Sequence, residues 1–75
     1  MNRKAARDVV NECGARMRFN VLTNHFVFHD ASNNPYPISG YRLQDMGKDE
    51  LRRILTQRTT PEAIAAAKAN NTNED

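Results

Sequence analysis

The chain has 75 residues and a mass of 8.5 kDa, with 11 basic and 9 acidic residues and a mean hydropathy of −0.79. A chain this short buries only about 60% of its unfolded surface and forms at most one domain. These values exclude a two-domain enzyme, a nucleotide-binding fold with a complete crossover sheet, and any barrel. We expect a single domain over residues 1–69, followed by a disordered polar tail over residues 70–75.

The single cysteine, Cys13, excludes an intrachain disulfide. Small secreted domains commonly depend on such bonds, so their absence favours a reducing cytoplasm. The longest apolar run covers residues 63–67, far short of the roughly 20 residues of a membrane span. We therefore expect a soluble cytoplasmic protein, and we interpret Cys13 as a small apolar helix residue instead of a reactive thiol.

Residues 3–13 are predicted to form a short helix that ends at Gly14, because apolar residues recur at helical spacing from Ala6 to Cys13. A β-hairpin is predicted to follow over residues 16–30. Its apolar residues alternate with polar ones, which is typical of half-buried strands.

The hairpin turn is predicted to be a two-residue turn at residues 23–24. Pairing the strands outward from it places Val21 opposite Phe26 and puts both apolar sets on one face. Turn-forming residues then lead to a predicted third strand over residues 38–43, whose Tyr41 and Leu43 would face the same core.

Two helices are predicted after the strands. The first covers residues 48–58 and follows Gly47 as its N-cap, and the second begins at Pro61 behind the N-cap Thr60. The element order predicts the α+β class: a small three-stranded antiparallel sheet packed with an N-terminal helix and two C-terminal helices.

No arrangement of residues in the sequence indicates catalysis or metal binding. His25 and His29 would lie about 13 Å apart along a strand, too far to share one metal ion. Ser39 lacks the glycines of a nucleophile elbow, and the three glycines are too scattered to form a phosphate-binding loop. We therefore assign no catalytic residue, no metal ligand and no cofactor, and we expect a non-enzymatic binding protein.

Protein binding is the leading hypothesis for this chain. The sheet face opposite the core is expected to combine apolar and charged residues, as partner surfaces do, unless the helix at residues 3–13 covers it. Tyr36 lies between two prolines and is a candidate anchor, and the edge of the third strand is a candidate for accepting a partner's strand. The residues expected to contact a protein partner are Leu22, Val27, His29, Tyr36, Ile38 and Arg42.

The alternative hypothesis is a small DNA- or RNA-binding regulator that contacts phosphates through arginine-rich helices. Sequence-specific reading by the last helix is not expected, because it offers almost no side chains that could contact base edges. The residues expected to make basic contacts, with protein or nucleic acid, are Arg3, Arg7, Arg18, Arg52 and Arg53.

The whole-chain profile resembles the small host-takeover proteins of bacteriophages, in particular the regulators that bind bacterial RNA polymerase and block initiation. The resemblance covers length, composition and element order. It implies a phage-encoded monomer in the bacterial cytoplasm that binds RNA polymerase subunits and inhibits transcription by steric or allosteric interference. An interface of roughly 800 Å² on this chain is large enough for such competition.

Overall fold

The computed structural model describes residues 1–70, so the predicted tail lies outside the described residues except for Asn70, which ends the last helix. The elements in chain order are α1 (Arg3–Glu12), β1 (Arg16–Asn20), β2 (His25–His29), β3 (Pro35–Ser39), α2 (Gly40–Asp45), α3 (Lys48–Thr56) and α4 (Pro61–Asn70). The strands form an antiparallel sheet in the order β1-β2-β3. The predicted α+β class is confirmed, and α2 is an additional short helix.

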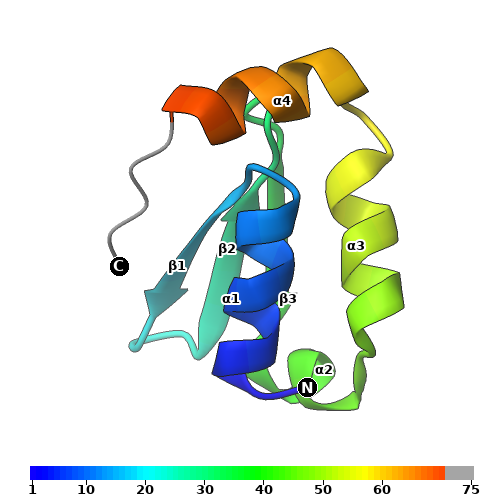
Figure 1. The fold of residues 1–75 in the computed structure, drawn as a ribbon. Helices are drawn as coiled ribbons and strands as arrows, with labels where there is room; N and C mark the ends of the chain where they lie inside the picture. Colours follow the sequence, from blue (N-terminus) through cyan, green and yellow to red (C-terminus); the bar gives the residue numbers. More distant parts are fainter. Residues whose placement is uncertain (71–75) are drawn as a thin grey trace.

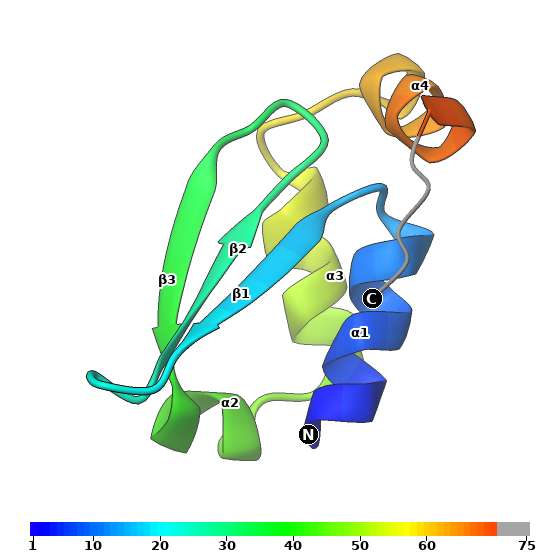
Figure 2. The same ribbon diagram turned by 90° about the vertical axis from the view of Figure 1, so that its left-hand side faces the viewer.

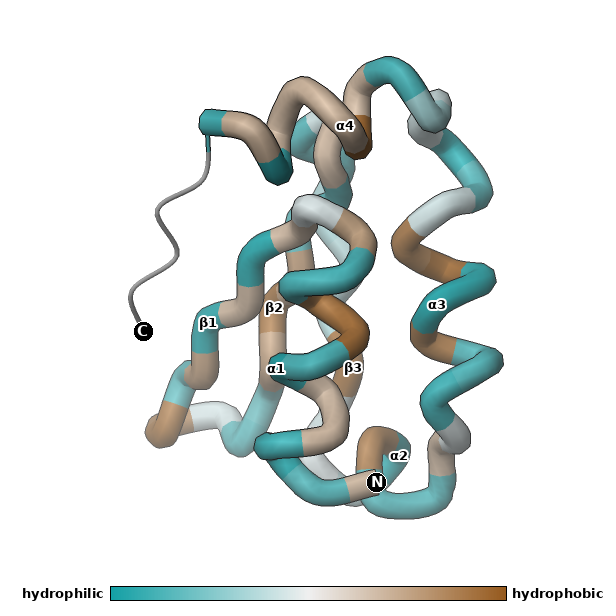
Figure 3. Tube along the Cα trace, viewed as in Figure 1, coloured by the Kyte–Doolittle hydropathy of each residue, from teal (hydrophilic) through white to brown (hydrophobic). Residues whose placement is uncertain are grey.

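Helices α1 and α3 pack on the same face of the sheet, and α4 lies beyond one end of it (Figures 1 and 2). This arrangement makes one core between the two helices and the sheet. Its buried residues include Phe26, Phe28 and Ile38 from the strands, Val9 and Val10 from α1, and Leu51 and Leu55 from α3. Figure 3 shows the same pattern, with hydrophobic segments of both helices turned toward the interior.

The junction between α1 and β1 explains why Gly14 is needed there. Gly14 has a φ of +63°, and the amide of Ala15 donates to the carbonyl of Val10 at 2.9 Å, which closes the helix. A Cβ atom at Gly14 would lie 3.0 Å from the carbonyl oxygen of Ile64. The glycine therefore also permits the close approach of α4.

The predicted register of the hairpin is wrong by two residues. Phe19, not Val21, lies opposite Phe26, because the turn contains four residues instead of two. The amide of Leu22 donates to the side chain of Asn20 at 3.0 Å, an interaction typical of an Asx turn. Val21 is consequently 76% exposed. A register shift of two residues leaves every side chain on the same side of the sheet. Apart from Val21, the hairpin residues that were predicted to point toward the core therefore do so.

The predicted third strand also begins and ends in the wrong place. The strand covers Pro35–Ser39, and the hydroxyl of Ser39 accepts the amide of Arg42 at 3.1 Å, which starts α2 where the strand was expected to continue. Tyr41 is therefore 75% exposed instead of facing the core. Leu43 is buried as expected, but from a helix.

The C-terminal helices follow their predicted starts. Helix α3 begins at Lys48 behind Gly47, and the hydroxyl of Thr60 accepts the amide of Ala63 at 3.1 Å at the start of α4. No residue of α4 is buried, so this helix is held by few contacts. Within residues 1–70, no helix has the length and apolar character needed to cross a membrane.

Candidate interaction surface on the open sheet face

The face of the sheet that points away from α1 and α3 carries no helix among the described residues (Figure 2). Side chains alternate along each strand, and the buried Phe26, Phe28 and Ile38 mark the inward set. The outward set, which we call the open face, consists of Arg16, Arg18, Asn20, His25, Val27, His29, Pro35, Pro37 and Ser39.

The open face is basic. It carries two arginines and two histidines, and none of its residues is Asp or Glu. The antiparallel register places Arg16 beside His29, with Arg18 two positions along the same strand. At the usual strand dimensions, these groups are spaced by about 5–7 Å across the face. An anionic partner therefore meets no repelling carboxylate on these strands.

A shallow depression of about 500 Å³ lies on the open face beside the hairpin turn, with Arg18, Val27 and His29 in its lining. The turn adds two apolar residues at its rim: Leu22 is 93% exposed and Val21 is 76% exposed. Figure 3 shows this apolar turn beyond the end of β1. The open face therefore has a basic centre and an apolar end.

A backbone contact sets the orientation of His25 on the open face. Its Nδ1 atom lies 2.8 Å from the carbonyl oxygen of Thr23 in the turn. Because a carbonyl oxygen only accepts hydrogen bonds, Nδ1 carries a proton in this contact, and Nε2 accepts a hydrogen bond when the ring is neutral or donates one when the ring is cationic. The exposed ring is thus held against the turn instead of rotating freely.

The structure brings together only part of the predicted protein-binding set. Val27 and His29 lie on the open face, and Leu22 lies at its end. The expectation for Ile38 is wrong, because this residue is 3% exposed and lies in the core. The predicted alternative, in which the first helix covers the open face, is also wrong, since α1 packs on the opposite face (Figure 2).

Tyr36 and Arg42 also lie elsewhere than expected. Tyr36 is half-buried on the helix side of the sheet, and its hydroxyl donates to Asp30 at 3.3 Å. Arg42 belongs to α2, where its guanidinium lies 3.9 Å from Glu50. Neither residue is part of the open face.

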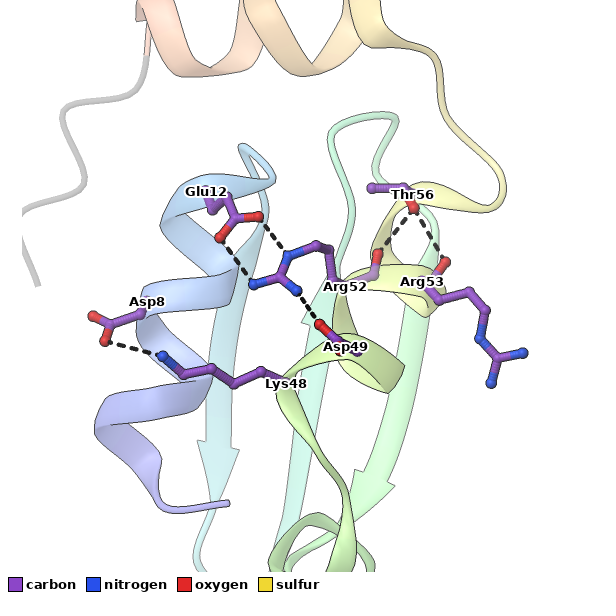
Figure 4. A network of polar contacts seen from close by, with 7 residues as sticks. All are labelled: Asp8, Glu12, Lys48, Asp49, Arg52, Arg53 and Thr56. Atoms are coloured by element: carbon purple, nitrogen blue, oxygen red, sulfur yellow. Dashed lines mark hydrogen bonds and ion pairs between the residues drawn. The ribbon is translucent and has the colours of Figure 1, made fainter.

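The five predicted basic contacts do not form one patch. Arg18 lies on the open face, whereas Arg3 lies over the ring of Phe19 at 5.1 Å from its centroid. Arg7 is half-buried on α1, and the side chain of Arg53 points away from α1 (Figure 4). Sequence reasoning missed Arg16 as a basic contact beside Arg18, although both residues alternate with Met17 and Phe19 along the strand.

Arg52 makes contacts within the chain instead of facing a partner. Its guanidinium donates two hydrogen bonds to Glu12 on α1, one of them at 3.2 Å, and a third to Asp49 on its own helix (Figure 4). The hydrogen bond from Arg52 is the main reason that the pKa of Glu12 lies below its ordinary value. Lys48 and Asp8 add a second α1–α3 ion pair at 3.9 Å. These pairs join the two helices across the side away from the sheet.

Asp30 is the one buried carboxylate among residues 1–70. It is 3% exposed and accepts the amides of Ser32 and Asn34 at 2.9 and 2.8 Å, together with the Asn34 side chain and the Tyr36 hydroxyl. Burial raises the pKa of Asp30, but the hydrogen bonds from Asn34, Ser32 and Tyr36 outweigh it and hold the pKa below its ordinary value. These bonds organise the β2–β3 loop, so the carboxylate has a structural role.

The described residues contain no group of three or more His, Cys, Asp or Glu side chains arranged to hold a metal ion.

Cys13 is buried, and burial raises the pKa of its thiol. A buried thiol with a raised pKa is a poor nucleophile, because the thiolate is the reactive form. These observations agree with the interpretation of Cys13 as a packing residue.

Comparisons with known proteins identify no relative of this chain. No family model, no curated protein and no solved structure matches it. The function must therefore be argued from the chemistry of its own surfaces, because the fold class alone does not specify an activity.

Proposed function

We propose that this chain is a small, non-enzymatic regulator that binds nucleic acid by laying a phosphate backbone across the open face. The observation that carries the proposal is a basic face without carboxylates on a packed sheet: Arg16, Arg18, His25 and His29 share it. Guanidinium groups bind phosphate through several hydrogen bonds at once. The helices hold the sheet from behind, so the four side chains start from fixed backbone positions.

The same face favours contact with the backbone over contact with bases. Stacking on bases is strongest on large aromatic rings, and the open face carries no Phe, Tyr or Trp, only the smaller imidazole rings of His25 and His29. Phe26 and Phe28 are buried on the other side of the sheet. We therefore expect binding with little dependence on sequence and a strong dependence on salt concentration.

The second candidate is a phage-encoded regulator that binds a host protein, with bacterial RNA polymerase as the preferred target and inhibition of transcription as the outcome. The exposed Val21 and Leu22 beside Val27 favour it, because apolar groups rimmed by charge are typical of protein interfaces. Two residues that were expected to contact a protein partner are engaged within the chain: Ile38 lies in the core, and the hydroxyl of Tyr36 donates to Asp30. We therefore place it second.

The primary test is the affinity for a labelled oligonucleotide of about 16 nucleotides, measured by fluorescence anisotropy over a salt series. Arg18→Glu should weaken binding on the order of tenfold, equal to about 1.4 kcal/mol, and reduce the salt slope by about one. The matched control is Arg53→Glu, which makes the same charge change at an exposed position on α3. Equal losses of affinity in the two variants, or an affinity that does not change with salt concentration, would contradict the proposal.

A pull-down from bacterial lysate separates the two candidates. The tagged chain is incubated with nuclease-treated lysate and washed at moderate salt, and bound proteins are identified by mass. Retention of polymerase subunits that is lost in Leu22→Ser supports the protein-binding candidate, because Leu22 is exposed and its replacement leaves the core intact. Retention of nucleic acid only in lysate without nuclease supports the primary proposal.

A further inference from the structure

The sheet has two edges, and they differ in chemistry. Strand β3 forms one edge and contains Pro35 and Pro37, which have no backbone N–H to donate. Strand β1 forms the other edge and has a backbone N–H at every position from Arg16 to Asn20. The expectation that the third strand's edge accepts a partner is therefore disfavoured, and β1 offers the better template for strand addition.

The inward residues of β1 are incompletely covered. Met17 and Phe19 are half-buried, whereas their neighbours Phe26 and Phe28 on the central strand are 6% and 0% exposed. Phe19 packs against Phe26 with ring centroids 4.7 Å apart, and the guanidinium of Arg3 covers part of its ring. A further strand beside β1 would bury the rest of this apolar row.

The outward residues of β1 determine which strand fits. Directly opposed side chains on paired strands have Cβ atoms about 4.5–5.5 Å apart, so Arg16 and Arg18 require carboxylates at two alternate positions of the incoming strand. Arg16 also donates to the side chain of Asn33, which leaves further guanidinium N–H groups for a partner. A second copy of this chain fits poorly, because antiparallel pairing centred on Arg18 would oppose two arginines.

We propose that the β1 edge binds an extended acidic segment of a partner protein as a fourth strand. The segment alternates carboxylate side chains, which face Arg16 and Arg18, with apolar side chains, which cover Met17 and Phe19. Backbone hydrogen bonds supply the affinity and the alternating side chains supply the specificity, as in other cases of strand addition.

Such a partner would regulate the open face. It would occupy Arg16 and Arg18, so it would compete with a phosphate backbone for the same guanidinium groups. This consequence rests on the proposed function, whereas the binding of an acidic strand does not. A peptide titration without nucleic acid therefore tests the edge by itself.

The test uses the full chain labelled with ¹⁵N and a capped peptide of about seven residues, alternating glutamate and valine, within the usual length of a strand. Backbone amide shifts and hydrogen exchange are recorded during the titration. We expect changes centred on Met17, Arg18 and Phe19 and slower exchange of the outward-pointing β1 amides. Changes confined to β3 or the helices, or no binding at millimolar peptide, would overturn the proposal.

Charge exchange tests the recognition directly. Arg16→Glu combined with Arg18→Glu should weaken binding of the glutamate peptide by at least about tenfold and bind the matching lysine–valine peptide instead, which also shows that the variant is folded. Arg53→Glu is the matched control and should bind as the original chain does. If the lysine peptide binds the original chain equally well, the edge does not select an acidic partner.

Discussion

Replacing Asp30 with asparagine tests how the β2–β3 loop is held. The carboxylate accepts four hydrogen bonds while 3% exposed, and the loop it organises also contacts the α3–α4 connection. There the side chain of Asn34 donates to the carbonyl of Arg58 at 3.2 Å, and the hydroxyls of Ser32 and Thr59 lie 2.7 Å apart. Asp30→Asn keeps the size of the side chain and removes its charge.

The size of the effect follows from the hydrogen bonds. Bonds to a charged group contribute about 1.5–3 kcal/mol each, and neutral ones about 0.5–1.5 kcal/mol. In the variant, the two backbone amides of Ser32 and Asn34 donate to a neutral oxygen, and the new amide group faces the Asn34 amide with donor against donor. We expect a loss of about 2–4 kcal/mol in the free energy of unfolding. That is a large part of the roughly 4–11 kcal/mol available to a domain of this size.

The effect of Asp30→Asn should depend on pH in one direction. Because the folded-state pKa of Asp30 is lowered, its contribution to stability is complete above the unfolded-state pKa of about 3.9. The contribution is lost as the pH falls through the lower folded-state pKa. The stability difference between the original chain and the variant should therefore narrow below about pH 4. Glu12 also has a lowered pKa, but both proteins contain it, so its pH-dependent contribution cancels in the difference between their free energies of unfolding.

Urea unfolding followed by far-ultraviolet circular dichroism measures these free energies at each pH. Asp45→Asn, which removes a charge from an exposed residue, is the matched control and should change stability by less than about 0.5 kcal/mol. A loss below about 1 kcal/mol for Asp30→Asn, or a stability difference that stays constant down to acidic pH, would refute the structural role of the buried carboxylate.

Three further predictions follow from single positions. Gly14→Ala should cost about 1–2 kcal/mol from its positive φ and speed hydrogen exchange in α4, because the new Cβ would lie 3.0 Å from the Ile64 carbonyl; unchanged exchange would contradict the close contact. Cys13 should react with a thiol reagent only as fast as the chain opens, so the rate should rise with urea. Glu12→Gln should cost less than about 1 kcal/mol at low salt and less again at high salt, because the ion pair with Arg52 is half-exposed; a larger, salt-independent loss would argue against this.

The sequence contains enough information for the fold class and for the starts of α1, α3 and α4, but not for the start of α2. Helix starts at Gly47 and Thr60 are local signals, and they were recognisable because a cap acts on its own first turn. The hairpin faces were predictable because side-chain alternation survives an even shift of register. The register itself was not, because the Asn20 side chain favours a longer turn than pairing alone suggests.

The errors around β3 and α2 had a different cause. A serine that caps a helix and a serine within a strand are the same residue in the sequence, so Ser39 gave no warning that the strand ends there. As a result, Ile38 was predicted on the outer face but lies in the core, and Tyr41 was predicted in the core but lies on the surface. The sheet face opposite the core was already recognisable as a candidate surface, but the sequence could not decide whether the first helix covers it, because no local pattern indicates which face a helix will cover. The structure places α1 and α3 on the other side of the sheet (Figure 2).

The most direct measurement is an NMR titration of the ¹⁵N-labelled full chain with a short oligonucleotide at low and high salt. Binding across the open face predicts amide shifts over Arg16–Asn20 and His25–His29 that disappear as salt is raised. Shifts confined to the outward surfaces of α1 and α3, with both strands unmoved, would contradict the assignment of the open face as the binding surface.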